Sequence, residues 1–173
     1  MSARRQRVVA FISGGGSNML ALARACEAAG YPAEIVAVFS DKPDAAGLAR
    51  AGGLGIPTQV FERKAYGSKA EHEAAILAAL AEIGPDLICL AGYMRLLSGD
   101  FIRPHTGRIL NIHPSLLPLF PGLHTHQRAI DAGMKVAGCT VHFVDEHLDH
   151  GPIVLQAQVP VDPSDTAETL SAK

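Results

Sequence analysis

The sequence predicts an α/β protein with an open, mostly parallel, Rossmann-like sheet that carries helices on both faces. Two observations lead to this prediction. Short apolar stretches alternate with longer amphipathic ones, as where residues 8–12 precede residues 18–29. Several of the apolar stretches are almost uninterrupted, which is typical of strands that helices cover on both faces. Strand and helix repeated in this order indicate right-handed βαβ units.

The elements can be placed one by one along the chain. The first helical stretch ends at Gly30, and a longer one ends at Gly84 and Pro85 after a stripe of apolar residues. After Pro114 the pattern changes to a loop, a short helix and two strands. The expected strands are residues 8–12, 34–40, 58–61, 86–91, 108–112, 136–144 and 153–161, and the expected helices are 18–29, 69–83 and 127–132.

The end of the chain reads as the start of one more helix. Asp165 and Glu168 have the spacing of a capping signature, and Leu170 is the first clear apolar contact. The chain stops at Lys173, within about two turns of that start. We therefore expect residues 1–173 to form a single domain whose C-terminal helix is truncated.

Composition excludes several classes of protein. The chain has 173 residues, of which 48% are apolar and 18% charged, with a net charge of −2. At ~150 residues per domain this length predicts one domain, and a disordered chain would be less apolar. The apolar runs are too short for a membrane span, and the near-neutral charge gives no attraction to nucleic acid.

The start of the chain and the cysteines bear on where the protein is found. The basic residues 1–7 precede only five apolar residues, too few for a secretory signal. Three widely separated cysteines suggest neither a disulfide framework nor a zinc knuckle. We expect a cytoplasmic protein.

A glycine-rich turn follows the first expected strand and leads into a helix through Gly16, Ser17 and Asn18. Glycines allow the backbone to turn tightly with its N–H groups outward, and the helix dipole adds positive charge, so the turn suits a phosphate. Met19 stands where a dinucleotide fingerprint or a nucleophile elbow needs glycine, and the Walker lysine is missing. We interpret the turn as a phosphate or carboxylate cradle. A turn used only for tight packing is the alternative.

The fifth expected strand ends with an amide and an imidazole on one face. Asn111 and His113 are two residues apart, so their side chains leave the strand on the same side. Pro114 favours an extended backbone at His113. Ligands bind beyond the carboxyl ends of such strands, so we expect this pair to face a ligand. A polar strand end exposed to water is the alternative.

A segment rich in histidine and acidic residues follows. Its spacing matches no recognisable metal motif, so we expect no metal. One carboxylate from this segment is expected to charge or orient His113, and the residues alone leave Asp149 and Asp145 both open. His72, on the polar side of a helix, is expected to be exposed. The possible ligands are His124, His126, His142, Asp145, Glu146, His147, Asp149 and His150.

Taken together, these motifs resemble the phosphoribosylglycinamide formyltransferase family, folate-dependent enzymes of purine biosynthesis. The resemblance extends over essentially the whole chain, and the block from Asn111 to Pro118 is specific to folate formyltransferases. The matching blocks are residues 14–18, 91–97, 111–118, 120–126 and 148–152.

The resemblance implies transfer of a formyl group from 10-formyltetrahydrofolate to the amine of glycinamide ribonucleotide, without a metal. Its partners would be small molecules, with no nucleic acid and no membrane, and the enzyme would be a monomer or homodimer. Lys69 stands where the family often has arginine, and His150 where it commonly has glycine. The implied catalytic residues are Asn111, His113 and Asp149; the ribonucleotide contacts are Gly16, Ser17 and Asn18; the folate contacts are Lys69, Met94, Arg95, Leu96, Leu97 and Asn111.

Two other classes of function stay open from the residues. A non-catalytic nucleotide- or phosphate-binding module would bind its ligand without turnover. A serine hydrolase would use Ser115 or Ser17 as nucleophile and would react with an acylating probe.

Overall fold

The computed structural model describes residues 4–173, so the first three residues of the basic start lie outside it. The chain divides into two compact units that meet in sequence between Ile109 and Leu110. Within the described residues, no helix has both the length and the apolar character needed to cross a membrane.

The sheet of the first unit consists of parallel strands in the order β3-β2-β1-β4. Strand β1 (Gln6–Ile12) pairs with a neighbour on each side, and from Val8 onward its residues are buried. This burial explains why its sequence is uninterrupted by polar residues. The other strands are β2 (Ala33–Ser40), β3 (Thr58–Val60) and β4 (Leu87–Leu90).

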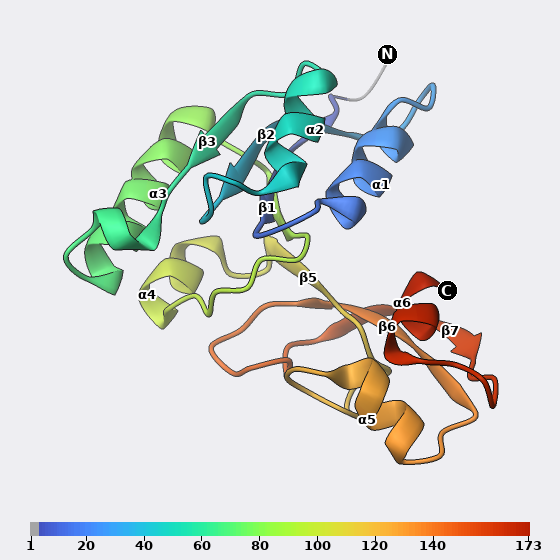
Figure 1. Ribbon diagram of the computed structural model, residues 1–173. Coiled ribbons are helices and arrows are strands. Elements are labelled where there is room, and N and C mark those ends of the chain that lie inside the picture. Colours follow the sequence, from blue (N-terminus) through green and yellow to red (C-terminus); the bar gives the residue numbers. More distant parts are fainter. Residues whose placement is uncertain (1–3) are drawn as a thin grey trace. The chain divides into compact units, whose positions relative to one another are not determined.

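Helices cover this part of the sheet on both faces. Figure 1 shows α3 on one side of the strands and α1 and α2 on the other. The parallel order and the two helical layers confirm the expected α/β class. The helices are α1 (Ser17–Cys26), α2 (Ala46–Gly53), α3 (Lys69–Ile83) and α4 (Gly99–Ile102), with short 3-10 turns η1 (Arg63–Ala65) and η2 (Arg103–His105).

Helix α3 has the ends that its sequence predicts. The Ser68 side chain accepts a hydrogen bond from the Glu71 N–H at the start, and Gly84 ends the helix in the left-handed region with φ 61°. The expectation that His72 is exposed is wrong. His72 is buried, with Nε2 2.8 Å from the Phe61 carbonyl oxygen, because this turn of α3 faces the unit's interior.

The core of the first unit is apolar and partly aromatic. The Phe11 ring lies 5.4 Å from that of Phe39 and 5.2 Å from that of Tyr93, measured between centroids. Met19 and Ala23 of α1 are buried. Burial of each large side chain of this kind contributes about 1.5–3 kcal/mol.

The second unit is antiparallel. Strand β5 (Ile109–His113) pairs with β6 (Val136–Phe143), which pairs with β7 (Ile153–Pro160). The register sets Asn111 opposite His142 and His113 opposite Thr140. The helices are α5 (Thr125–Asp131) and α6 (Ala167–Ala172), which lie against each other.

Helix α6 begins one residue later than the capping signature predicts. Its N-cap is Thr166, and the reciprocal bond comes from the Thr169 side chain rather than from Glu168. The Asp165 carboxylate instead accepts hydrogen bonds from the Thr169 hydroxyl and the Lys173 ammonium group. Leu170 is buried, as expected.

Candidate active site

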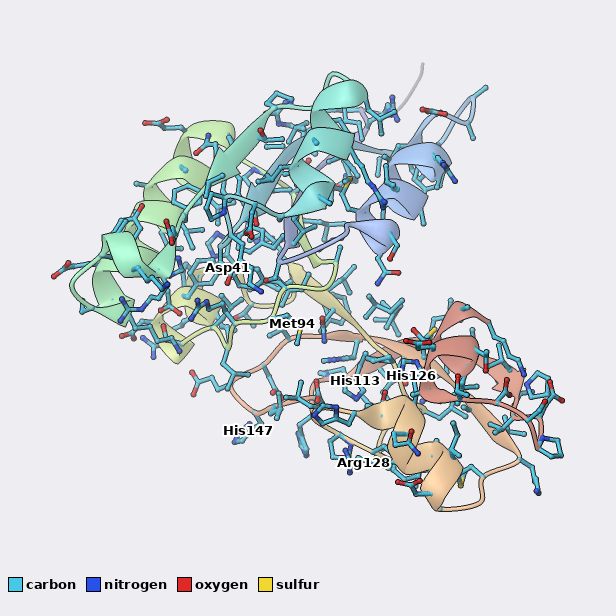
Figure 2. The ribbon with its side chains drawn as sticks, viewed as in Figure 1. Asp41, Met94, His113, His126, Arg128 and His147 are labelled. Atoms are coloured by element: carbon cyan, nitrogen blue, oxygen red, sulfur yellow. The ribbon has the colours of Figure 1, made fainter. Side chains whose placement is uncertain are left out.

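Strand pairing in the second unit buries the histidine that the sequence singles out. His113 is the last residue of β5 and is only 5% exposed. Figure 2 labels it within the second unit. Its Nδ1 lies 3.4 Å from Asp149 Oδ1, and its Nε2 lies 3.0 Å from the Phe120 carbonyl oxygen. Both ring nitrogens thus face oxygen atoms, one of a carboxylate and one of a backbone carbonyl.

Asp149 is held in place by its own backbone and by a neighbouring loop. Its φ is 51°, in the left-handed region that few residues other than glycine adopt. Its Oδ2 accepts a hydrogen bond of 2.8 Å from the Gly122 N–H, and its side chain is 7% exposed. Asp145 accepts from the His147 N–H instead. The structure therefore brings Asp149, and not Asp145, to His113.

Asn111 contacts a residue for which sequence reasoning found no role beyond possible metal binding. Its Nδ2 lies 3.2 Å from Nε2 of His142, and Nδ1 of His142 lies 2.9 Å from the Phe143 carbonyl oxygen. A neutral His142 with its proton on Nδ1 satisfies both contacts, because Nε2 can then accept from the amide. The amide nitrogen carries a second N–H. The alternation of side chains along β6 could have indicated that His142 faces inward. Its position opposite Asn111 depends on how β5 and β6 pair, which the sequence pattern does not give.

We refer to Asn111, His113 and Asp149 as the Asn–His–Asp cluster. All three side chains belong to one unit, and His142 links them, because its Nε2 lies 3.2 Å from the Asn111 amide nitrogen and 4.0 Å from Asp149 Oδ1. Such a set can donate hydrogen bonds to a developing oxyanion and can relay a proton.

The glycine turn, defined as Gly16, Ser17 and Asn18, opens α1. Gly16 is its N-cap with φ 72°, and no acidic residue lies in the first turn. Ser17 and Asn18 are exposed, so the first N–H groups of α1 are open to an anion. A Cβ on Gly16 would lie 2.8 Å from the Gly47 Cα, so close packing also requires glycine here. Both interpretations of the turn therefore have a physical basis.

The loop after β4 borders a pocket within the first unit. Met94 and Leu96 are each 65% exposed on this loop. Lys69 also borders the pocket and lies 3.8 Å from the Glu73 carboxylate, measured from Nζ. The structure thus gathers the expected folate residues of this unit around one hollow, whose lining residues are Arg63, Lys69, His72, Glu73, Tyr93, Met94, Arg95, Leu96 and Leu97.

A buried carboxylate anchors this loop. Asp41 Oδ1 accepts from the Ser13 hydroxyl at 2.5 Å, and its Oδ2 accepts from Nε of Arg95 at 2.8 Å. The same hydroxyl accepts from the Met94 N–H at 2.9 Å. Figure 2 labels Asp41 and Met94 in this unit. Burial raises the pKa of the neighbouring Tyr93, which stays neutral. Sequence reasoning did not single out Asp41, although it directly follows a strand.

The serines considered as nucleophiles stand in ordinary structural positions. Ser115 is buried, and its hydroxyl donates to the Leu119 carbonyl at 2.6 Å. Ser17 is the exposed first residue of α1. In the part of the chain that the structure describes, the contacts of Ser115 thus pair it with a carbonyl rather than with an imidazole, which is not the arrangement of an activated serine.

The remaining histidines and acids of the second unit separate into two places. Asp145, His147 and His150 gather on the loop before β7. His126 lies in α5, and burial lowers its pKa. His124 precedes α5 with a φ of 55°.

The chain was compared with known proteins at the level of family, sequence and structure. The family described as formyl transferase matches residues 6–173. The trifunctional purine biosynthetic protein adenosine-3 of Drosophila melanogaster is 48% identical over the whole chain, which spans 13% of that protein's length. The phosphoribosylglycinamide formyltransferase of Haemophilus influenzae is 47% identical, with 97% of this chain and 79% of that protein covered.

A solved structure is similar over nearly the same length. The crystal structure of phosphoribosylglycinamide formyltransferase from Brucella melitensis has a TM-score of 0.95 and 72% identity, and it covers 98% of this chain and 87% of that one. The chain belongs to the formyl transferase family and, within it, to the phosphoribosylglycinamide formyltransferases. The family expected from the sequence motifs is confirmed.

Proposed function

We propose that the chain transfers the formyl group of 10-formyltetrahydrofolate to the amine of glycinamide ribonucleotide. The observation that carries this proposal is the Asn–His–Asp cluster, in which the Asp149 side chain meets the buried end of β5, in a chain of this family. The names of the relatives supply the substrates, and the cluster supplies groups that suit the reaction.

The first step is attack of the substrate amine on the formyl carbon. A C–N bond forms and the carbonyl electrons move to the formyl oxygen, which becomes negative. The free N–H of Asn111 and the Nε2–H of His113 would donate to that oxygen. In the structure Nε2 faces the Phe120 carbonyl, so the formyl oxygen must replace this carbonyl as the acceptor. His142 acts on Asn111 by fixing the direction of its amide.

The second step breaks the bond between the formyl carbon and the folate nitrogen. The amine must lose a proton, and the folate nitrogen must gain one. His113 can relay this proton because an imidazole ring can both donate and accept a proton at its nitrogens. The Asp149 carboxylate, 3.4 Å from Nδ1, stabilises the charged ring during the transfer. No covalent enzyme intermediate is needed, and no metal takes part in these steps.

The other expected contacts belong to substrate binding. The glycine turn would hold the ribonucleotide phosphate, and the pocket beside Lys69 would hold folate, with Met94, Arg95, Leu96 and Leu97 on its border. Asn111 would contact folate as well as the oxyanion. We further propose that residues 1–173 work as one cytoplasmic formyltransferase domain, as a monomer or homodimer, with no nucleic acid or membrane partner.

A direct assay tests the proposal against both alternatives. The purified chain is mixed with the two substrates, and formylated ribonucleotide and free tetrahydrofolate are measured by chromatography. We expect the two products in equal amounts, and neither when one substrate is omitted. Binding of the ribonucleotide without turnover would support a binding module instead. Covalent labelling by an acylating probe, with loss of activity, would support a serine enzyme.

A further inference from the structure

Three side chains that can bind a metal meet on the loop before β7 of the second unit, the loop that also carries Asp149. One ligand atom from each of Asp145, His147 and His150 lies within 4.8 Å of the other two. The Asp145 oxygens are 3.8 Å from Nδ1 of His147 and 3.7 Å from Nδ1 of His150. We propose that the Asp145–His147–His150 cluster is a surface site for one zinc-like divalent metal ion.

The donor set selects the class of metal. Two imidazoles and one carboxylate suit zinc and its neighbours in the first transition row, whereas magnesium and calcium prefer oxygen alone. Zinc binds these groups at about 2.0–2.2 Å, which places neighbouring tetrahedral ligands roughly 3.3 Å apart. The separations of 3.8 and 3.7 Å, each to a different Asp145 oxygen, and the upper limit of 4.8 Å between one ligand atom from each residue are wider, so the side chains must move closer together to hold an ion. The histidine side chains are 79% and 78% exposed, so they can rotate inward without disturbing a core.

The loop already holds part of the site in place. The His147 N–H donates to Asp145 Oδ1 at 2.8 Å, which fixes one carboxylate oxygen towards the histidines. The two imidazole rings are 5.7 Å apart between centroids. His150 follows Asp149 directly, and its ring is turned to Asp145 rather than to His113.

The site does not use the neighbouring Asp149. The Asp149 carboxylate is turned inward to His113 and the Gly122 N–H, whereas the cluster faces solvent. Figure 2 shows His147 on the outer loop, apart from His113. A bound ion would tie together the backbone on both sides of Asp149. The metal site is independent of the proposed formyl transfer, because binding can be measured without either substrate.

Metal binding is tested by titrating the purified chain with zinc in calorimetry and with cobalt in visible absorption. We expect one ion per chain and the cobalt spectrum of a site with nitrogen and oxygen ligands. His147→Gln and His150→Gln should each weaken zinc binding at least about tenfold, since even the loss of a supporting partner weakens metal sites by 10–100-fold. Glu146→Gln and His124→Gln are matched controls that should retain the affinity.

Thermal unfolding gives a second readout. Zinc should raise the melting temperature of the unmodified chain and of both controls, because a ligand of the folded state stabilises it by mass action. It should not raise that of the two histidine variants. Unchanged zinc affinity in those variants, or no binding in the unmodified chain, would overturn the proposal. Zinc binding that disappears only after the free thiols are alkylated would also overturn the proposal, because the ligands would then be Cys26, Cys89 or Cys139.

Discussion

The glycine turn of the first unit and the Asn–His–Asp cluster of the second unit are built in opposite ways. The turn offers backbone N–H groups at the start of α1, and its residues Ser17 and Asn18 are exposed. The cluster offers side chains, and His113 and Asp149 are almost fully buried. A backbone site is sensitive to the volume and φ of its residues, whereas a side-chain site is sensitive to charge and hydrogen bonding. Substitutions should therefore separate the two.

The largest effect is expected from the oxyanion donors. Asn111→Ala and His113→Asn each remove a group that donates in the transition state, so each should lower kcat by about 10²–10³, roughly 2.7–4 kcal/mol. Steady-state kinetics with both substrates measures the loss. His147→Asn, at a histidine of the same unit whose side chain is 79% exposed, is the matched control and should stay within about twofold, because exposed substitutions usually cost little. If Asn111→Ala and His113→Asn lower kcat only slightly, these two residues do not stabilise the transition state.

Asp149→Asn should have the next largest effect. The amide can still accept from the Gly122 N–H, but it carries no charge to face the His113 ring. The kcat should therefore fall, by less than the loss of either oxyanion donor.

The measurement for Asp149→Asn is steady-state kinetics together with separate binding titrations of folate and of the ribonucleotide. The affinities for both substrates should change little, because Asp149 is assigned to the chemistry rather than to binding. An Asp149→Asn protein with an unchanged kcat would contradict the assigned role of the contact with His113.

Gly16→Val tests the backbone site. The new side chain would meet the Gly47 Cα at 2.8 Å and would force valine into a positive φ. We expect the ribonucleotide to bind at least tenfold more weakly, about 1.4 kcal/mol, with folate affinity nearly unchanged. Separate titrations of each substrate measure this.

A control separates binding from folding in that experiment. Gly30 also has a positive φ, of 77°, but nothing lies within 4 Å of a Cβ there. Gly30→Ala should therefore strain the backbone of the same unit without changing either affinity. The Gly16→Val protein could be as stable as the Gly30→Ala control and yet lose affinity for both substrates equally. That result would show that the turn serves packing only.

Sequence reasoning worked where local chemistry decides the structure. The uninterrupted apolar run of β1 and the ends of α3 are set by burial and by capping, and both are predicted correctly. Helix α2 was missed because alanine and glycine fill most of Ala46–Gly53, which leaves no apolar stripe to detect. Its small residues are needed where Gly47 approaches Gly16.

The candidate site shows the same division. Asn111 and His113 share a face because the strand period is two, and this is readable from sequence. The choice of Asp149 over Asp145 depends on a positive φ and on a bond from the Gly122 loop. The partner of Asn111 depends on the register of β5 against β6. These are tertiary features, so periodicity could not supply them and only the family resemblance pointed to Asp149.

The smallest effect is expected at a side chain that contacts substrate without taking part in the chemistry. Lys69 borders the pocket of the first unit, is about half exposed and lies 3.8 Å from Glu73. Arginine at this position could bind a folate carboxylate through two parallel hydrogen bonds, where lysine offers a single point charge. Lys69→Arg should tighten folate about threefold, within the net range of one added hydrogen bond, and should leave kcat unchanged. Lys64→Arg, on an exposed lysine outside the pocket, is the matched control. A change in kcat rather than in the folate KM would contradict this prediction, because it would show that Lys69 acts on the reacting atoms and not only on folate binding.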